Sequence, residues 1–155
     1  MELKNIKKLN YNTMKEIRTE IEINAPKERV WEVLMDFEKH SEWNPFIKSI
    51  EGQSILGGKL KVLLTPPDTS EMTFKPKVVG YRENEQFAWQ GKLFIKGIFD
   101  GRHIFELSDV NGGCKLVHRE EFGGILAGAL SSKVGENTKK GFEAMNRALK
   151  ERAEA

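Results

Sequence analysis

The stretch from Ile47 to Phe122 constrains the fold most, because it contains only short strand-like segments between turn signals. Gly, Pro, Asn and Asp gather in those turns, as at Gly57-Gly58 and Pro66-Pro67-Asp68. Connections this short cannot hold a crossover helix, so neighbouring strands are expected to pair antiparallel. The six predicted strands centre on or span Ile50, Val62, Phe74–Val79, Phe87–Ile95, Phe99–Leu107 and Lys115–Phe122.

One strand and two short helices are predicted before this block. Residues 17–23 alternate apolar and polar side chains, which indicates a half-buried strand. From Pro26 to about Glu38 apolar residues repeat at helical spacing, and proline is favoured at the first helical position. Pro45 then restricts residues 41–46 to a short helix or turn.

A long helix is predicted after the strands, from Gly124 to about Ala153. Its apolar residues share one side, and three glycines weaken it at separate points: Gly128, Gly135 and Gly141. A strand, two helices, six strands and a long helix are typical of an α+β fold, with a curved antiparallel sheet around the terminal helix.

The length of 155 residues suits a single domain, which we assign to residues 15–155. Residues 1–14 have weak periodicity, and we interpret them as an N-terminal tail or extension; an ordered helix packed on the domain is the alternative. Residues 1–15 hold four Lys and one Glu, so their net charge is 4 − 1 = +3. Because the whole chain carries 25 − 23 = +2, the rest is close to neutral.

The composition argues against several classes of protein. No apolar run is long enough for stable membrane insertion, and no basic stripe interleaved with aromatic residues indicates nucleic-acid binding. Cys114 is the only cysteine, so neither an intramolecular disulfide nor a cysteine-based zinc site is expected, and no cofactor is predicted. No apolar segment follows the basic N-terminus, and we therefore expect a cytoplasmic protein.

The last predicted hairpin has a register that the sequence defines. A two-residue or a four-residue loop at Asn111-Gly112-Gly113 gives the same pairing, in which partner numbers sum to 223. His103 then lies opposite Glu120, and Phe105 lies opposite His118, all on the apolar face. On the other face Arg102 lies opposite Glu121, where an exposed ion pair is expected.

Three titratable residues therefore lie among aromatic residues on the inner face: His103, His118 and Glu120. Burying an unpaired charge is costly, so these groups are expected to pair or to line a wet cavity. Three interpretations remain open: a structural hydrogen-bond cluster, a polar anchor inside an apolar pocket, and a metal site with two His and one carboxylate.

The inward-facing large apolar residues also have two interpretations. Each taken alone suits a plain core, whereas the set suits the wall of a ligand cavity between sheet and helix. The candidate wall residues are Phe74, Trp89, Phe99, Phe105, Phe122, Leu130 and Phe142.

Several motifs resemble the START/Bet v 1-like superfamily, also called SRPBCC or polyketide cyclase/dehydrase-like. They are Ala25-Pro26-x-x-x-Val30-Trp31-x-Val33-Leu34 and Glu42-Trp43-Asn44-Pro45-Phe46-Ile47. Two more resemble a bacterial and archaeal ligand-binding subgroup: Phe99-Asp100-Gly101-x-His103-x-Phe105-x-Leu107 and Gly141-Phe142-Glu143-Ala144-Met145-Asn146-x-Ala148-Leu149. The resemblance implies a helix-grip fold: a seven-stranded antiparallel sheet wrapped around a long C-terminal helix, with two short helices after the first strand. It also implies a hydrophobic cavity, in which members bind lipids, sterols, polyketides or plant hormones, and some members cyclise aromatic polyketides.

We therefore expect the chain to bind a small hydrophobic molecule, lipid- or polyketide-like, with His103, His118 and Glu120 orienting its polar end. The alternative is a polyketide cyclase or dehydratase in which His103 and Glu120 form the acid–base pair and His118 assists. A third hypothesis is an interaction protein that presents Trp43 and Phe46, although both residues also suit a cap on the core. The sequence identifies no protein partner.

Overall fold

The computed structural model describes residues 15–91, 100–123 and 132–155. Its elements are β1 (Lys15–Ile23), α2 (Lys27–Met35), a 3₁₀ turn (Phe37–Lys39), α3 (His40–Trp43), β2 (Ile47–Gly52), β3 (Leu60–Leu64), β4 (Met72–Phe74), β5 (Lys77–Arg82), β6 (Gln86–Gly91), β7 (Asp100–Val110), β8 (Gly113–Gly123) and α4 (Ser132–Glu154). This order confirms the predicted α+β class. In the described part of the chain, no helix is long and apolar enough to cross a membrane.

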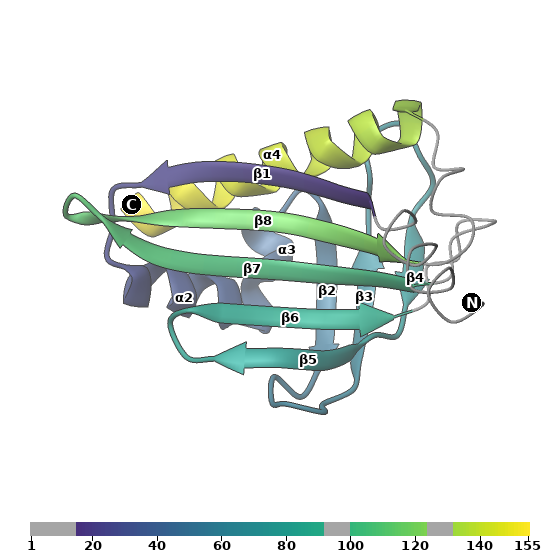
Figure 1. Ribbon diagram of the computed structural model, residues 1–155, viewed down its shortest axis with the longest axis horizontal. Helices are drawn as coiled ribbons and strands as arrows, with labels where there is room; N and C mark the ends of the chain where they lie inside the picture. The colour runs from purple at the N-terminus through teal and green to yellow at the C-terminus, as the bar shows by residue number, and fades with distance from the viewer. Residues whose placement is uncertain (1–14, 92–99, 124–131) are drawn as a thin grey trace, which may run out of the picture.

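The strands form two antiparallel sheets. The larger has the order β1-β8-β7-β6-β5, and the smaller has the order β2-β3-β4. In Figure 1, β2 and β3 run across the direction of the larger sheet's strands, and α4 lies along β1. The helix-grip arrangement is confirmed, but the described residues form eight strands in two sheets instead of the seven strands in one sheet that we expected.

Pro76 accounts for the extra strand. The segment Phe74–Val79 was predicted to be one strand, but β4 ends at Phe74 and β5 begins at Lys77. Proline has no backbone N–H for a sheet ladder, so it interrupts the pairing at this point. The two sheets meet here through an isolated bridge between Lys59 and Lys77.

The predicted hairpin register is confirmed. Strands β7 and β8 pair from Val110↔Gly113 outward, so His103 faces Glu120 and Phe105 faces His118. Asn111 and Gly112 form the two-residue turn with φ of 36° and 82°, in the left-handed region that such hairpin turns need.

The expected ion pair on the outer face has different partners. Arg102 does lie opposite Glu121, but Glu121 pairs with Arg119 on its own strand. Arg119 also reaches Glu106 at 2.7 Å, and Arg102 instead donates to Gln90 at 3.5 Å. Arg119 binds the carboxylates because glutamates lie on both strands beside it, Glu16 on β1 and Glu106 on β7, whereas the β6 neighbour of Arg102 is the uncharged Gln90.

Buried hydrogen bonds around His40 hold the segment that follows α2. His40 Nε2 donates to the Leu34 carbonyl at 2.7 Å, and its Nδ1 accepts from Asn44 Nδ2 at 3.1 Å. Asn44 Oδ1 in turn accepts the backbone N–H groups of Phe46 and Ile47, both at 2.9 Å. These bonds fix α3 against the first residues of β2.

Helix α4 packs closely on the aromatic end of the core. Phe142, Met145 and Leu149 are buried as predicted, whereas the expected helix residues 124–131, including Gly128, lie outside the described residues. A Cβ on Gly141 would lie 2.5 Å from the Phe46 ring, so this glycine permits close contact as well as weakening the helix. Phe46 is only 3% exposed, which corrects its proposed role as an exposed contact residue.

Candidate functional site

The larger sheet and α4 bring most of the predicted site residues together. His103 and Phe105 come from β7, and His118, Glu120 and Phe122 from β8. Trp89 pairs with His103 from β6, Phe142 faces both imidazoles from α4, and Phe74 contacts Trp89 from β4. All eight of these side chains are buried. The other two predicted residues, Phe99 and Leu130, lie outside the described residues.

The polar residues of this face form one continuous hydrogen-bonded chain. His103 Nδ1 lies 2.5 Å from Glu120 Oε2, and His103 Nε2 lies 2.7 Å from His118 Nε2. His118 Nδ1 is 2.8 Å from Asn146 Oδ1 on α4. Asn146 Nδ2 donates to Thr19 Oγ1 on β1 at 2.9 Å, and the Thr19 hydroxyl donates to the His118 carbonyl at 2.8 Å.

The backbone carbonyl at the end of the hydrogen-bonded chain fixes the direction of the bonds as far as His118, and the charge state of the imidazoles fixes the rest. A carbonyl oxygen can only accept, so the Thr19 hydroxyl donates to it and accepts from the Asn146 amide. Asn146 Oδ1 must then accept from His118, whose Nδ1 therefore carries a proton. With both imidazoles neutral, His103 Nε2–H donates to His118 Nε2, and Glu120 must donate its own proton to His103 Nδ1.

The chain thus contains one transferable proton, which lies on Glu120, His103 or His118. Burial decides among these positions, because it disfavours every charged form. Desolvation raises the pKa of Glu120 to about 8, with a smaller contribution from the charge of Glu121. Desolvation also lowers the pKa of His103 to about 3 and lowers the pKa of His118 well below its usual value. At neutral pH the proton therefore rests on Glu120, and the whole hydrogen-bonded chain of side chains is uncharged.

Aromatic rings cover both imidazoles. Trp89 stacks on His103 with ring centroids 4.7 Å apart and planes 17° from parallel. Phe142 stacks on His118 at 4.1 Å and 16°. His103 and Glu120 are only 4% and 6% exposed, so the shared proton is held away from bulk water. The Glu120 carboxyl can therefore accept or donate a hydrogen bond in apolar surroundings, and it can transfer a proton near neutral pH.

The ring nitrogens are used within the chain rather than directed at one central point. His118 is bonded through both nitrogens, as is His103. Among the described residues, no group of three His, Cys, Asp or Glu is arranged to hold a metal ion. The geometry accordingly favours the hydrogen-bonded interpretations of this cluster.

Two members of the chain, Thr19 and Asn146, were not predicted. Each has a signal in the sequence, because each interrupts an apolar pattern at an inward position. Thr19 falls between Ile17 and Ile21 on the inner face of β1, and Asn146 falls one turn after Phe142 on the buried side of α4. A polar residue on a buried face needs a partner, although the sequence does not say which.

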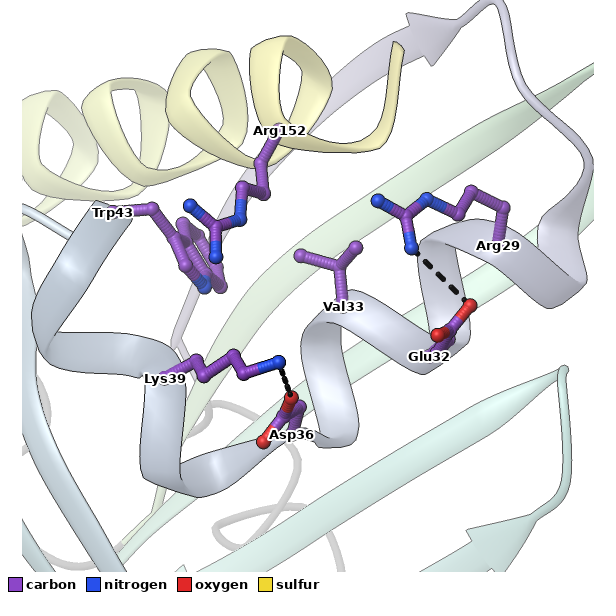
Figure 2. A pocket seen from close by; sticks show the side chains of 7 residues that line it. All are labelled: Arg29, Glu32, Val33, Asp36, Lys39, Trp43 and Arg152. Carbon is purple, nitrogen blue, oxygen red and sulfur yellow. Dashed lines mark hydrogen bonds and ion pairs between the residues drawn. The ribbon is translucent and has the colours of Figure 1, made fainter. Parts of the chain in front are cut away.

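A separate small pocket lies where α2 and α3 meet the end of α4 (Figure 2). Its volume is about 80 Å³, and its lining residues are Arg29, Glu32, Val33, Asp36, Lys39, Trp43 and Arg152. Ion pairs join Arg29 to Glu32 at 3.2 Å and Lys39 to Asp36 at 3.4 Å. This space is polar and takes only a few water molecules, so it does not suit a hydrophobic ligand.

With this geometry in view, comparison with known proteins decides the family. A family model described as "Polyketide cyclase / dehydrase and lipid transport" matches residues 14–154. The chain belongs to this family. Membership confirms the SRPBCC/Bet v 1-like resemblance, and it implies binding of a hydrophobic ligand or cyclase activity. Among curated proteins, none matches the chain significantly.

Solved structures confirm the fold at low sequence identity. Ara h 8.0201 is 17% identical with a TM-score of 0.72, over 90% of this chain and 97% of that chain. The protein TTHA0849 from Thermus thermophilus is 16% identical with a TM-score of 0.71, over 90% and 97%. The Zhui aromatase/cyclase from Streptomyces sp. R1128 is 16% identical with a TM-score of 0.72, over 91% and 94%.

Proposed function

We propose that this protein binds a small hydrophobic ligand, lipid- or polyketide-like, between its larger sheet and α4, with Glu120 as the polar anchor. The observation that carries the proposal is an uncharged, oriented polar chain that is set into an aromatic face and ends in a carboxylic acid. Ligand sites of this kind combine apolar walls with a few polar groups that fix orientation. In this proposal Phe99 and Leu130 complete the wall, as the sequence predicts.

The chain's direction indicates which ligand group the anchor takes. Glu120 donates its only proton from Oε2 to His103, so its other oxygen, Oε1, is left to accept. A ligand hydroxyl can donate to that oxygen without bringing a charge into the apolar site. The proposed ligand is therefore an apolar molecule with a terminal or ring hydroxyl.

Two substitutions at one position test this assignment. Glu120→Gln keeps a donor for His103 and a carbonyl acceptor for the ligand, whereas Glu120→Leu removes both. Native mass spectrometry and tryptophan fluorescence, with a panel of fatty acids, hydroxy fatty acids, sterols and phenolic polyketides, measure the affinity. We expect saturable binding by the wild type and the Gln variant, and about a tenfold or greater loss in the Leu variant. A wild type that binds no member of the panel, or a folded Leu variant with full affinity, contradicts the proposal.

A second candidate function is a cyclase or dehydratase, and the shared proton specifically favours it. A carboxylic acid with a pKa of about 8, bonded to a neutral imidazole, can protonate a leaving hydroxyl or an enolate oxygen at neutral pH. Glu120→Gln separates the two functions, because glutamine preserves binding but cannot transfer the proton. Conversion of a poly-β-ketone thioester, followed by mass spectrometry, must be present in the wild type and lost in Glu120→Gln and His103→Ala. Binding without any conversion in the wild type rejects the enzyme.

A further inference from the structure

Two large apolar side chains lie exposed side by side in the connection between β2 and β3. Ile55 is 58% exposed and Leu56 is 68% exposed, and neither belongs to the hydrophobic core. Tyr81 is the third exposed large hydrophobic residue in the described ranges, but its ring packs edge-on against Trp31. We call Ile55 and Leu56 the apolar tip.

The apolar tip is held in place by the backbone rather than carried on a loose loop. The Gly58 N–H donates to the Ile55 carbonyl at 2.8 Å, and Gly57 has a φ of 80°, as the third residue of a type II turn requires. The Gly57 N–H then donates to the Val78 carbonyl at 2.9 Å, and the Val78 N–H donates to the Gly58 carbonyl at 2.8 Å. In Figure 1 this connection projects past β5, the edge strand of the larger sheet. A partner would thus meet a preformed apolar surface and would not have to order it.

A basic groove lies next to the apolar tip. It is an open groove of about 530 Å³, lined by Glu51, Gly52, Lys59, Leu60, Lys61, Lys75, Pro76 and Lys77. Four Lys and one Glu give it a charge of 4 − 1 = +3. Lys77 joins the groove to the tip, because its Cε would lie 3.9 Å from a Cβ placed on Gly57.

The groove's lysines are arranged without counter-ions. Lys59 and Lys77 are direct cross-strand partners, an arrangement that like charges disfavour. Within the described ranges, none of the four lysines is within ion-pair distance of a carboxylate, whereas Lys48 and Lys150 each contact one. The fold thus places positive charge beside exposed aliphatic side chains. Within the described residues, these lysines have no carboxylate partner and these aliphatic side chains are not covered.

We propose that the apolar tip and the basic groove form a docking surface for an anionic lipid bilayer. Aliphatic side chains enter the boundary of the acyl region, while lysines close behind them remain among the phosphates. The cations are all lysines, whose compact ammonium groups suit a diffuse layer of negative charge better than a site that needs fixed bidentate geometry. This association is reversible and peripheral, and it does not depend on what binds between the larger sheet and α4.

Vesicle co-sedimentation of the full chain tests the proposal. The vesicles contain phosphatidylcholine alone or an equal mixture of phosphatidylcholine and phosphatidylglycerol. We expect binding to the anionic vesicles only, and weaker binding at higher salt because exposed charges are then screened. The double variant Lys59→Gln/Lys77→Gln should bind about thirtyfold more weakly. Ile55→Ser/Leu56→Ser should also lose about tenfold or more.

A matched control changes two exposed lysines of α4, Lys139→Gln/Lys140→Gln, which removes the same charge elsewhere and should keep most of the binding. Every variant retains residues 1–14, so a contribution from that basic segment cancels. Equal binding by all variants, a control that loses as much as the groove variant, or equal affinity for neutral vesicles overturns the proposal. Binding to poly-glutamate without binding to vesicles assigns the groove to an acidic polypeptide and also overturns it.

A second measurement reports insertion directly. Leu56→Cys labelled with an environment-sensitive fluorophore should shift to the blue when anionic vesicles are added. Cys114 is buried, and burial raises the pKa of its thiol to about 11, so the label goes to position 56. A label that stays in water while the protein binds vesicles contradicts the role of the apolar tip.

Discussion

The proton held by Glu120 predicts a specific dependence of stability on pH, and Glu120→Gln exposes it. Glutamine can donate an amide N–H to His103 Nδ1, as the protonated acid does, and it fills nearly the same volume. The variant therefore reproduces the protonated hydrogen-bonded chain without its titratable carboxyl. Any difference in the pH dependence of the two proteins then belongs to this one group.

The pKa of Glu120 sets the direction and the magnitude of this dependence of stability on pH. The carboxyl has a pKa of about 8 when folded and an ordinary value of 4.5 when unfolded. The stabilisation that comes from retaining the proton is complete below pH 4.5 and is lost as the pH rises towards 8. One proton corresponds to about 1.4 kcal/mol per pH unit, so the Gln variant gains about 3 to 4 kcal/mol on the wild type between about pH 5 and 8.

Urea unfolding of both proteins at several pH values and constant ionic strength measures the gap, that is, the difference in their free energies of unfolding. The histidines titrate in both proteins, so their contributions largely cancel in the difference. Glu22→Gln makes the same chemical change at an exposed position of β1 and serves as the matched control. A gap between the wild type and Glu120→Gln that stays constant from about pH 5 to 8 would refute the raised pKa, and with it the protonated chain.

Three further predictions concern the same region. Between about pH 6.5 and 4.5 the unfolded polypeptide protonates His103 and His118, which burial keeps neutral in the fold, while the folded hydrogen-bonded chain keeps one proton on Glu120. The net difference is one proton, so urea unfolding should show a loss of stability of about 1.4 kcal/mol for each unit by which the pH falls, and burial of His40, which lowers its pKa, adds to that loss; a flat profile contradicts this. Asn146→Leu should cost about 2 to 3 kcal/mol, because it leaves His118 Nδ1–H without an acceptor; unchanged thermal unfolding contradicts this. Gly141→Ala should cost about 1 to 3 kcal/mol by contact with Phe46, whereas Gly135→Ala, which meets no atom within 4 Å, should gain about 0.5 to 1 kcal/mol; equal effects on the melting temperature contradict the packing argument.

The register that builds the site could be predicted because its causes are local. The turn at Asn111-Gly112-Gly113 and the alternation on both strands agree on one pairing, and that pairing brings His103 beside Glu120. The family motifs then supplied the arrangement of helix and sheet, which no local pattern contains.

What could not be predicted depends on contacts between distant segments. The hydrogen-bonded chain is completed by Thr19 and Asn146, which are 127 positions apart in sequence and meet only because α4 packs along β1. Likewise, Glu121 pairs with Arg119 and not with Arg102, which lies opposite it, and this depends on side-chain geometry across three strands. The division of one expected strand at Pro76 is different, because the proline was visible in the sequence and its missing N–H was a usable signal.

The identity of residue 120 argues that the proton itself has a role. If the chain served only to join the sheet to α4, a glutamine at this position would make the same hydrogen bonds without a carboxyl whose burial costs stability above pH 4.5. At neutral pH that cost is about 3 kcal/mol, a large fraction of the stability of an ordinary domain. In a purely structural cluster nothing offsets this loss of stability. In a functional site the loss is offset, because the site transfers the proton or binds its ligand more tightly when the proton is present. The glutamate therefore favours a functional interpretation over a structural one, and Glu120→Gln determines whether the proton is transferred or only retained.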